Sequence, residues 1–165
     1  EFARFNPKIL YQRPLNAILL ELRSLPYSKG TPFGGVGGEG CKDIRRHLRH
    51  CSTPITTLSG FENFLCSSTH SGGHVFLDLL HQLLPSTIDA APRIVFKHRD
   101  LGPDYIVVDV TDNHYAITVI LDWEYSGFYP EYYESVRCTN CLTPYDKDDW
   151  YLYLPDCVSP KRYAH

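Results

Sequence analysis

Residues His98–Tyr105 read HRDLGPDY, and Asp122-Trp123-Glu124 follow them after a segment rich in β-branched and aromatic side chains. A segment of that composition with one internal turn predicts a β-hairpin. The hairpin would carry one polar loop before its first strand and another after its second. Because the outer ends of hairpin strands lie side by side, Asp100 and Asp122 are expected at the same mouth. These two loops decide the expected fold and the expected site.

The two loops resemble the catalytic loop and the metal-binding loop of kinases. Protein kinases show H-R-D-L-x-x-x-N, in which the Asp accepts the proton of the acceptor hydroxyl and the Asn binds Mg²⁺. Every position of His98–Tyr105 except the last is compatible with that pattern. The resemblance implies that Asp100 is the catalytic base and that His98 holds the loop by hydrogen bonds. It also implies that Asp122 supplies a hard oxygen ligand to Mg²⁺.

A longer resemblance runs through Ile94–Asp109 and Ile120–Tyr132. These stretches are similar to H-G-D-L-x-P-x-N-I-x-V-D and I-D-W-E-x-A-G-x-Y-P-E-Y in the fungal branch of the aminoglycoside phosphotransferase and choline kinase family. Leu19–Ser24, Gly34–Gly38 and Cys41–Arg45 also resemble the region ahead of the catalytic loop in that family. The resemblance implies an α+β fold: a mostly helical, protein-kinase-like C-terminal lobe with a small β-hairpin that carries both motifs.

Three features depart from the family pattern. Arg99 stands where the family has Gly, although protein kinases have Arg at this position. Tyr105 replaces the Asn ligand, and a neutral phenol is a poor Mg²⁺ ligand and much bulkier than a carboxamide. The adjacent Asp104 is acidic, but on an extended segment its side chain points the other way.

The third departure is the absence of an N-terminal nucleotide lobe, which in such kinases supplies a Gly-rich loop, a strand Lys and a helical Glu. Nothing before Pro14 matches it. Residues Gly35–Gly40 satisfy G-x-G-x-x-G, but they follow an expected helix and no Lys-bearing strand comes after them. We therefore interpret them as a connection and not as a phosphate loop. On this basis neither Mg²⁺ nor ATP is expected as a cofactor.

The sequence thus predicts a degenerate relative of the family that is not an ATP-dependent kinase. It would keep an acidic cleft for binding a small molecule or for ATP-independent acid–base chemistry. One alternative is an active phosphotransferase that uses Mg²⁺ and ATP and whose N-terminal lobe is not part of this sequence. Besides Asp100, His98 and Asp122, the candidate substrate-binding residues are Asp104, Tyr105, Trp123, Glu124 and Glu131.

A second alternative is a secreted interaction protein stapled by disulfides among its six cysteines. Cys138 and Cys141 have the spacing of half a zinc site, but no second C-x-x-C or H-x₃-H accompanies them. Reduced thiols are therefore the preferred interpretation.

The chain has 165 residues, enough for one domain with a normal core. Hydrophobic residues make up 43% and charged residues 21%, as in soluble globular proteins. A net charge of −3 provides no basic face, so we expect no nucleic-acid and no membrane partner. No signal peptide is visible, and a cytoplasmic protein with a small-molecule ligand is expected. Homo-oligomers would form through apolar surface left bare by the absent lobe.

Within one domain, residues 1–92 are expected to be helical and loop, residues 93–138 to hold the hairpin and a following helix, and residues 139–165 to form an irregular tail. The expected helices are Pro14–Ser24 with Pro14 in its first turn, a short helix opened by the capping box Ser59-x-x-Glu62, Gly73–Leu84, and one that begins at Pro130. The expected strands are Ile94–Phe96, Tyr105–Val108 and Tyr115–Leu121.

Overall fold

The computed structural model describes residues 8–43, 49–66, 92–111, 114–139, 145 and 149–163. Within these ranges the chain is a mixed α+β protein, which confirms the expected fold class at that level. Its helices are α1 (Lys8–Arg23), α2 (Leu58–Cys66) and α4 (Tyr133–Cys138). Its strands form two-stranded antiparallel sheets that pair β1 (Lys42–Asp43) with β2 (Arg49–His50), β3 (Ile94–Lys97) with β6 (Gly127–Pro130), and β4 (Ile106–Thr111) with β5 (His114–Ile120). Short 3₁₀ helices are η1 (Pro103–Tyr105), η2 (Trp150–Tyr153) and η3 (Pro160–Arg162).

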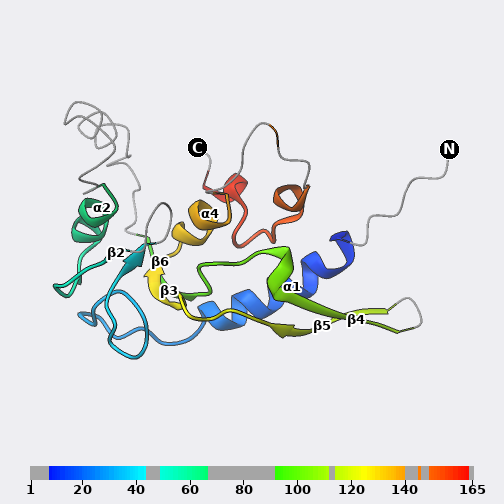
Figure 1. Cartoon of the computed structure of the whole chain (residues 1–165), viewed down its shortest axis with the longest axis horizontal. Coiled ribbons are helices and arrows are strands. Elements are labelled where there is room, and N and C mark those ends of the chain that lie inside the picture. Colours follow the sequence, from blue (N-terminus) through cyan, green and yellow to red (C-terminus); the bar gives the residue numbers. More distant parts are fainter. Residues whose placement is uncertain are drawn as a thin grey trace.

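Helix α1 runs along the base of the molecule and contacts β3, β5 and η2 (Figure 1). It begins at Lys8, so Pro14 lies inside the helix and not in its first turn as expected. Proline in a helix interior removes a backbone hydrogen bond and costs about 3 kcal/mol. The complete burial of Leu15 next to it, with Leu19 on the same face, offsets that cost. None of the helices formed by the described residues is long and apolar enough to cross a membrane.

Two hydrophobic clusters lie on either side of the motif loops. The first packs α1 against the hairpin β4–β5 and the C-terminal segment, and its buried members are Leu15, Leu19, Leu101, Cys138, Trp150, Leu154, Cys157 and Val158. The second joins α2, β6 and α4, and its buried members are Phe33, Cys41, Ile55, Phe61, Tyr129 and Tyr133. Leu101 and Tyr129 therefore anchor the motif region in different clusters.

The hairpin is confirmed, with its strands at slightly different bounds. Strand β4 begins one residue later than expected and extends to Thr111, and β5 begins at His114 and ends at Ile120, one residue earlier than expected at each end. Ile106 pairs with Ile120 at one end of the ladder, and Thr111 pairs with His114 at the other. In Figure 1 the hairpin projects from the body of the molecule alongside α1.

Two further expected helix starts are wrong, besides that of α1. Helix α2 begins at Leu58, and Thr57 caps it because its hydroxyl oxygen accepts the Gly60 N–H at 3.1 Å. The expected capping residue Ser59 lies inside the first turn. Pro130 does not begin a helix but ends β6, paired with Ile94, at a position where the missing N–H is tolerated. The helix after it, α4, begins only at Tyr133.

The described residues of the tail contain two 3₁₀ helices and no strand, with Trp150 buried in the first cluster. The expected helix Gly73–Leu84 lies outside the described residues.

Candidate functional site

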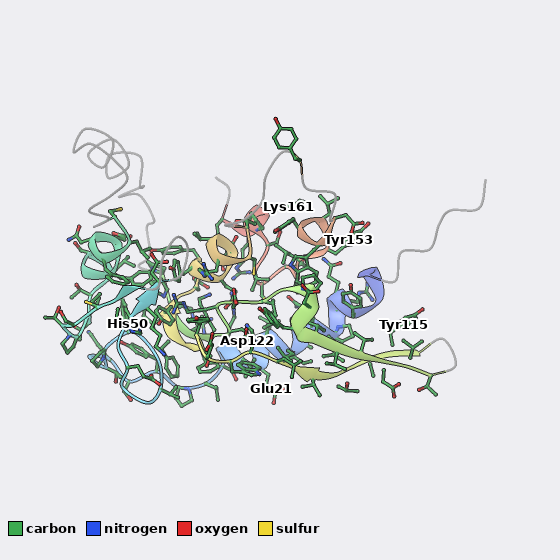
Figure 2. The ribbon with its side chains drawn as sticks, in the orientation of Figure 1. Glu21, His50, Tyr115, Asp122, Tyr153 and Lys161 are labelled. Carbon is green, nitrogen blue, oxygen red and sulfur yellow. The ribbon has the colours of Figure 1, made fainter. Side chains whose placement is uncertain are left out.

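The hairpin brings the two motif loops together. The Leu121 N–H donates to the Tyr105 carbonyl at 2.8 Å, directly beyond the Ile106–Ile120 pair. Figure 2 shows Asp122 at this base of the hairpin near the middle of the molecule, whereas Tyr115 lies towards its far end. The loop after β3 and the loop after β5 therefore share one mouth, as the spacing predicts.

The His98 ring connects the two loops. Its Nδ1 accepts the Asp100 N–H at 3.3 Å, and its Nε2 lies 2.6 Å from the Leu121 carbonyl oxygen. Because Nδ1 accepts, Nε2 carries the proton and donates it to that carbonyl. The ring is fully buried and also packs edge-on against Trp123, with ring centroids 4.6 Å apart. His98 thus fixes the positions of the two loops relative to each other.

Backbone strain is located in both loops. Among the described residues, the non-glycine residues with positive φ are Arg99 at 71° and Asp122 at 62°. Each such conformation costs about 1–2 kcal/mol and persists only where surrounding contacts impose it. Strained residues of this kind concentrate at functional sites, so the backbone independently marks the region that the motifs mark.

Arg99 is the central contact of the first loop. Its fully buried guanidinium lies 4.0 Å from the centroid of the Tyr129 ring and 5.1 Å from that of Tyr133. It donates to the Tyr129 hydroxyl at 2.7 Å, to the Tyr125 carbonyl at 3.3 Å, and to the Lys42 carbonyl. From the sequence, Arg99 is expected only to be tolerated in place of glycine. The structure shows that its guanidinium links the motif loop to β1, β6 and the turn before β6.

Helix α4 contributes two residues that sequence reasoning missed. Glu134 accepts the Arg99 N–H at 2.7 Å through Oε1. Arg137, one turn later, donates from Nε to the Arg99 carbonyl at 3.0 Å and from Nη2 to Asp100 Oδ1 at 3.2 Å. No local pattern marks these two residues as functional, because their roles come from a tertiary contact.

The charges at the mouth are acidic. Burial raises the pKa of Asp100, while the adjacent Arg137 lowers it and Asp122 raises it again. The charge of Asp100 also raises the pKa of the Tyr105 phenol, as do a hydrogen bond to Asp122 and the Asp122 charge. Tyr105 is therefore a neutral donor to the Asp122 carboxylate at neutral pH. A similar hydrogen bond to Glu124 raises the pKa of Tyr125.

The remaining candidates lie differently. Glu124 is exposed and close enough to influence Asp100, and Asp104 is exposed on η1. Trp123 is half-buried, stacks on Phe96 at 6.3 Å, and donates from Nε1 to the Ile120 carbonyl at 2.6 Å. These contacts make it a support of His98.

Glu131 does not join the charges around Asp100, which are those of Arg137, Asp122, His98 and Glu124. Its carbonyl oxygen instead accepts from Lys97 Nζ at 2.6 Å, from the Tyr163 hydroxyl at 3.0 Å and from Arg23 Nη2 at 3.4 Å. The structure therefore places the Glu131 backbone in a separate buried cluster of donors.

The donors at the mouth do not fit a Mg²⁺ site. In the part of the chain that the structure describes, no group of three or more His, Cys, Asp or Glu side chains could hold a metal ion. At the position where the kinase pattern has a carboxamide oxygen, Tyr105 presents a phenol whose pKa is raised by Asp100 and Asp122, so it stays protonated there and is a poor Mg²⁺ ligand. Of the acidic side chains at the mouth, Asp100 is paired with Arg137, and Glu124 is exposed.

The cysteines that the structure describes (Cys41, Cys51, Cys66, Cys138 and Cys157) are free thiols. Burial raises the pKa of Cys138, and its C-x-x-C partner, Cys141, lies outside the described residues.

Comparison of the chain with models of known protein families, with curated proteins and with solved structures found no match.

Proposed function

We propose that this chain is a relative of the aminoglycoside phosphotransferase and choline kinase family, with a kinase-like C-terminal lobe whose cleft binds a small molecule without ATP-dependent phosphoryl transfer. The observation that supports it best is the position of Tyr105 between the two loops: its carbonyl accepts the Leu121 N–H next to Asp122, and the charges of Asp100 and Asp122 raise the pKa of its phenol. The carboxylate pair of a phosphotransferase is kept, while the position of the metal-binding amide is filled by a donor.

The ligand is a cationic molecule that carries hydroxyl groups. Asp100, Asp122 and Glu124 give the mouth a negative potential. The groups that lower the pKa of Asp100 are Arg137 and His98. The rings of Tyr105 and Tyr125 lie next to these carboxylates and offer π faces to an ammonium group. Hydroxyl groups of the ligand would donate to the carboxylate oxygens.

Asp100 also supports a proton-transfer role in the same cleft. It is half-buried, and burial raises its pKa, which makes its carboxylate a stronger base than an exposed one. Its second oxygen, Oδ2, is left for a ligand hydroxyl, since Oδ1 is the atom that bonds Arg137. Such a reaction needs no nucleotide.

A Mg²⁺- and ATP-dependent phosphotransferase is the second candidate. It is favoured by one observation: the hydrogen bond from His98 to Leu121 couples the two loops and presents both aspartates at one mouth. Phosphoryl transfer needs this arrangement for the acceptor hydroxyl and the metal. The occupation of the third ligand position by Tyr105 makes it the weaker candidate.

A thermal-shift screen with amines, amino alcohols, amino sugars and neutral polyols, followed by calorimetry on the hits, tests the proposal. We expect hits among the cationic hydroxyl compounds. Asp100→Asn and Asp122→Asn should each weaken binding about tenfold or more, by removing charge from the mouth.

The matched control is Asp109→Asn, which removes an exposed carboxylate on β4 away from the mouth and should leave affinity unchanged. Neutral polyols that bind as tightly as the amines would contradict the proposal. Equal losses in Asp109→Asn and Asp122→Asn would contradict it as well.

A further inference from the structure

Helix α4 holds the Arg99 residue from both sides of its backbone. Glu134 accepts its N–H at 2.7 Å, and Arg137 Nε donates to its carbonyl at 3.0 Å. The two side chains are three positions apart in the helix, so they leave it on one face. Arg99 is fully buried, and Glu134 and Arg137 are buried as well, which keeps water from competing for these bonds.

The hydrogen bonds from Glu134 and Arg137 act on a strained backbone position. Arg99 has φ of 71°, a conformation that L residues other than Gly, Asn and Asp rarely adopt. Bonds to both the N–H and the C=O of one residue fix the orientation of the two peptide groups that flank it. The orientation of the next residue, Asp100, is set by the second of these peptide groups.

Arg137 also reaches the Asp100 side chain itself. Its Nη2 lies 3.2 Å from Oδ1, so one guanidinium holds both the peptide before Asp100 and the carboxylate of Asp100. A planar guanidinium with donors in a fixed fork couples those two positions more rigidly than an ammonium group would.

We propose that Glu134 and Arg137 are the positioning residues of the cleft: they impose the left-handed conformation at Arg99 and present the carboxylate of Asp100 to the ligand. The assignment rests on the proposed function, in which Asp100 contacts the ligand. It adds that the side chains of α4, outside both motifs, decide how Asp100 is aimed and charged.

Several groups face Asp100 and together set its protonation. From α4 comes Arg137, from the same loop His98, from the loop after β5 Asp122 and Glu124, and from η1 Tyr105. Of these, Arg137 is the largest influence that favours the ionised form. Its removal leaves burial and the two acidic neighbours, all of which favour the protonated form.

The first test measures the Asp100 carboxyl by carbon-13 NMR as a function of pH, without any ligand. In Arg137→Gln the titration midpoint should rise by about one to three pH units. Arg137→Lys keeps the charge and should stay close to the native midpoint. Arg13→Gln removes an exposed arginine from α1 and serves as the matched control, with an unchanged midpoint. A native midpoint in Arg137→Gln would overturn the proposal.

The second test measures amide hydrogen exchange at Arg99. Glu134→Ala should speed it about tenfold or more, because the buried N–H loses its acceptor. Glu134→Gln keeps an oxygen acceptor and should restore slow exchange. If Glu134→Ala does not fold, the Glu134→Gln exchange rate and the Arg137→Gln midpoint still decide the matter. Fast exchange of the Arg99 N–H in native protein would show that Glu134 does not hold it. Because neither test uses a ligand, failure here is distinguishable from failure to find one.

Discussion

Arg99 shows how one residue determines the order of the motif loop. Its backbone is strained, and its guanidinium lies between the Tyr129 and Tyr133 rings while donating to Tyr129 and to two carbonyl groups. These guanidinium contacts add to the backbone bonds from Glu134 and Arg137 in holding the strained conformation, since removal of the guanidinium would leave buried acceptors unpaired.

Arg99→Gly should therefore destabilise the protein, although glycine relieves the strained φ. The expected loss in the free energy of unfolding is about 3 kcal/mol, since a buried charged group and its hydrogen bonds are removed together. Urea unfolding measures it. The control is Arg93→Gly, which removes an exposed arginine just before β3 and should cost about 1 kcal/mol or less. Equal losses in the two variants would show that the guanidinium contacts contribute little.

At the scale of elements, the hairpin was predictable and its surroundings were less so. A high content of β-branched residues marks β4 and β5, whereas β6 is short and ends in Pro130, which in isolation resembles a helix start. Thr57 caps α2 although Ser59 has the capping-box spacing. The roles of Glu134 and Arg137 depend on which loop α4 meets, and that is a tertiary fact without a local signature.

A close approach of two backbones fixes the position of β6. Phe128 and Gly34 exchange N–H···O bonds at 3.1 and 2.9 Å, and the strand begins at Gly127. A Cβ atom on Gly127 would lie 2.1 Å from the Gly34 carbonyl oxygen. No side-chain rotation relieves a collision with backbone, so this position requires glycine.

Gly127→Ala should lower the free energy of unfolding by about 3 kcal/mol, because β6 must move away from Gly34. Gly102→Ala is the control: its Cβ would meet only the Tyr105 ring at 3.7 Å, an ordinary contact, and about 1 kcal/mol or less is expected. Denaturant unfolding of both variants checks this. An unchanged midpoint for Gly127→Ala would mean that the strand does not lie where the structure places it.

At the scale of the whole molecule, a buried cluster of donors joins distant parts of the chain. Arg23 at the end of α1, Lys97 in β3 and Tyr163 near the C-terminus all donate to the Glu131 carbonyl. Arg23 and Tyr163 also donate to the Cys157 carbonyl. The cluster therefore holds α1, the β3–β6 sheet and the C-terminal segment together.

Lys97 makes the stability of this cluster depend on pH. Burial lowers its pKa to about 7, with Glu134 raising it and Arg23 lowering it further. Between pH 7 and the ordinary lysine range, the unfolded chain binds more protons than the folded one. Stability should therefore rise with pH above about 7, by up to about 1.4 kcal/mol per pH unit from this group.

Urea unfolding of native protein and Lys97→Met at pH 7.0 to 8.5 (about one and a half units) tests this, before the raised pKa values of buried cysteines and tyrosines act in the opposite sense. The native slope should exceed that of Lys97→Met. Lys161→Met, at an exposed position, should keep the native slope. Parallel slopes in native protein and Lys97→Met would show that Lys97 stays protonated in the folded state.

We propose a kinase-like cleft in which Tyr105 stands in place of the metal ligand. Calorimetric titration with Mg²⁺·ATP, run in parallel on native protein and on Tyr105→Asn, tests this proposal. We expect no saturable, metal-dependent heat of binding for the native chain. Binding by Tyr105→Asn alone would place the loss at this residue. Micromolar, Mg²⁺-dependent binding of ATP by the native chain would contradict the proposed loss of the metal site.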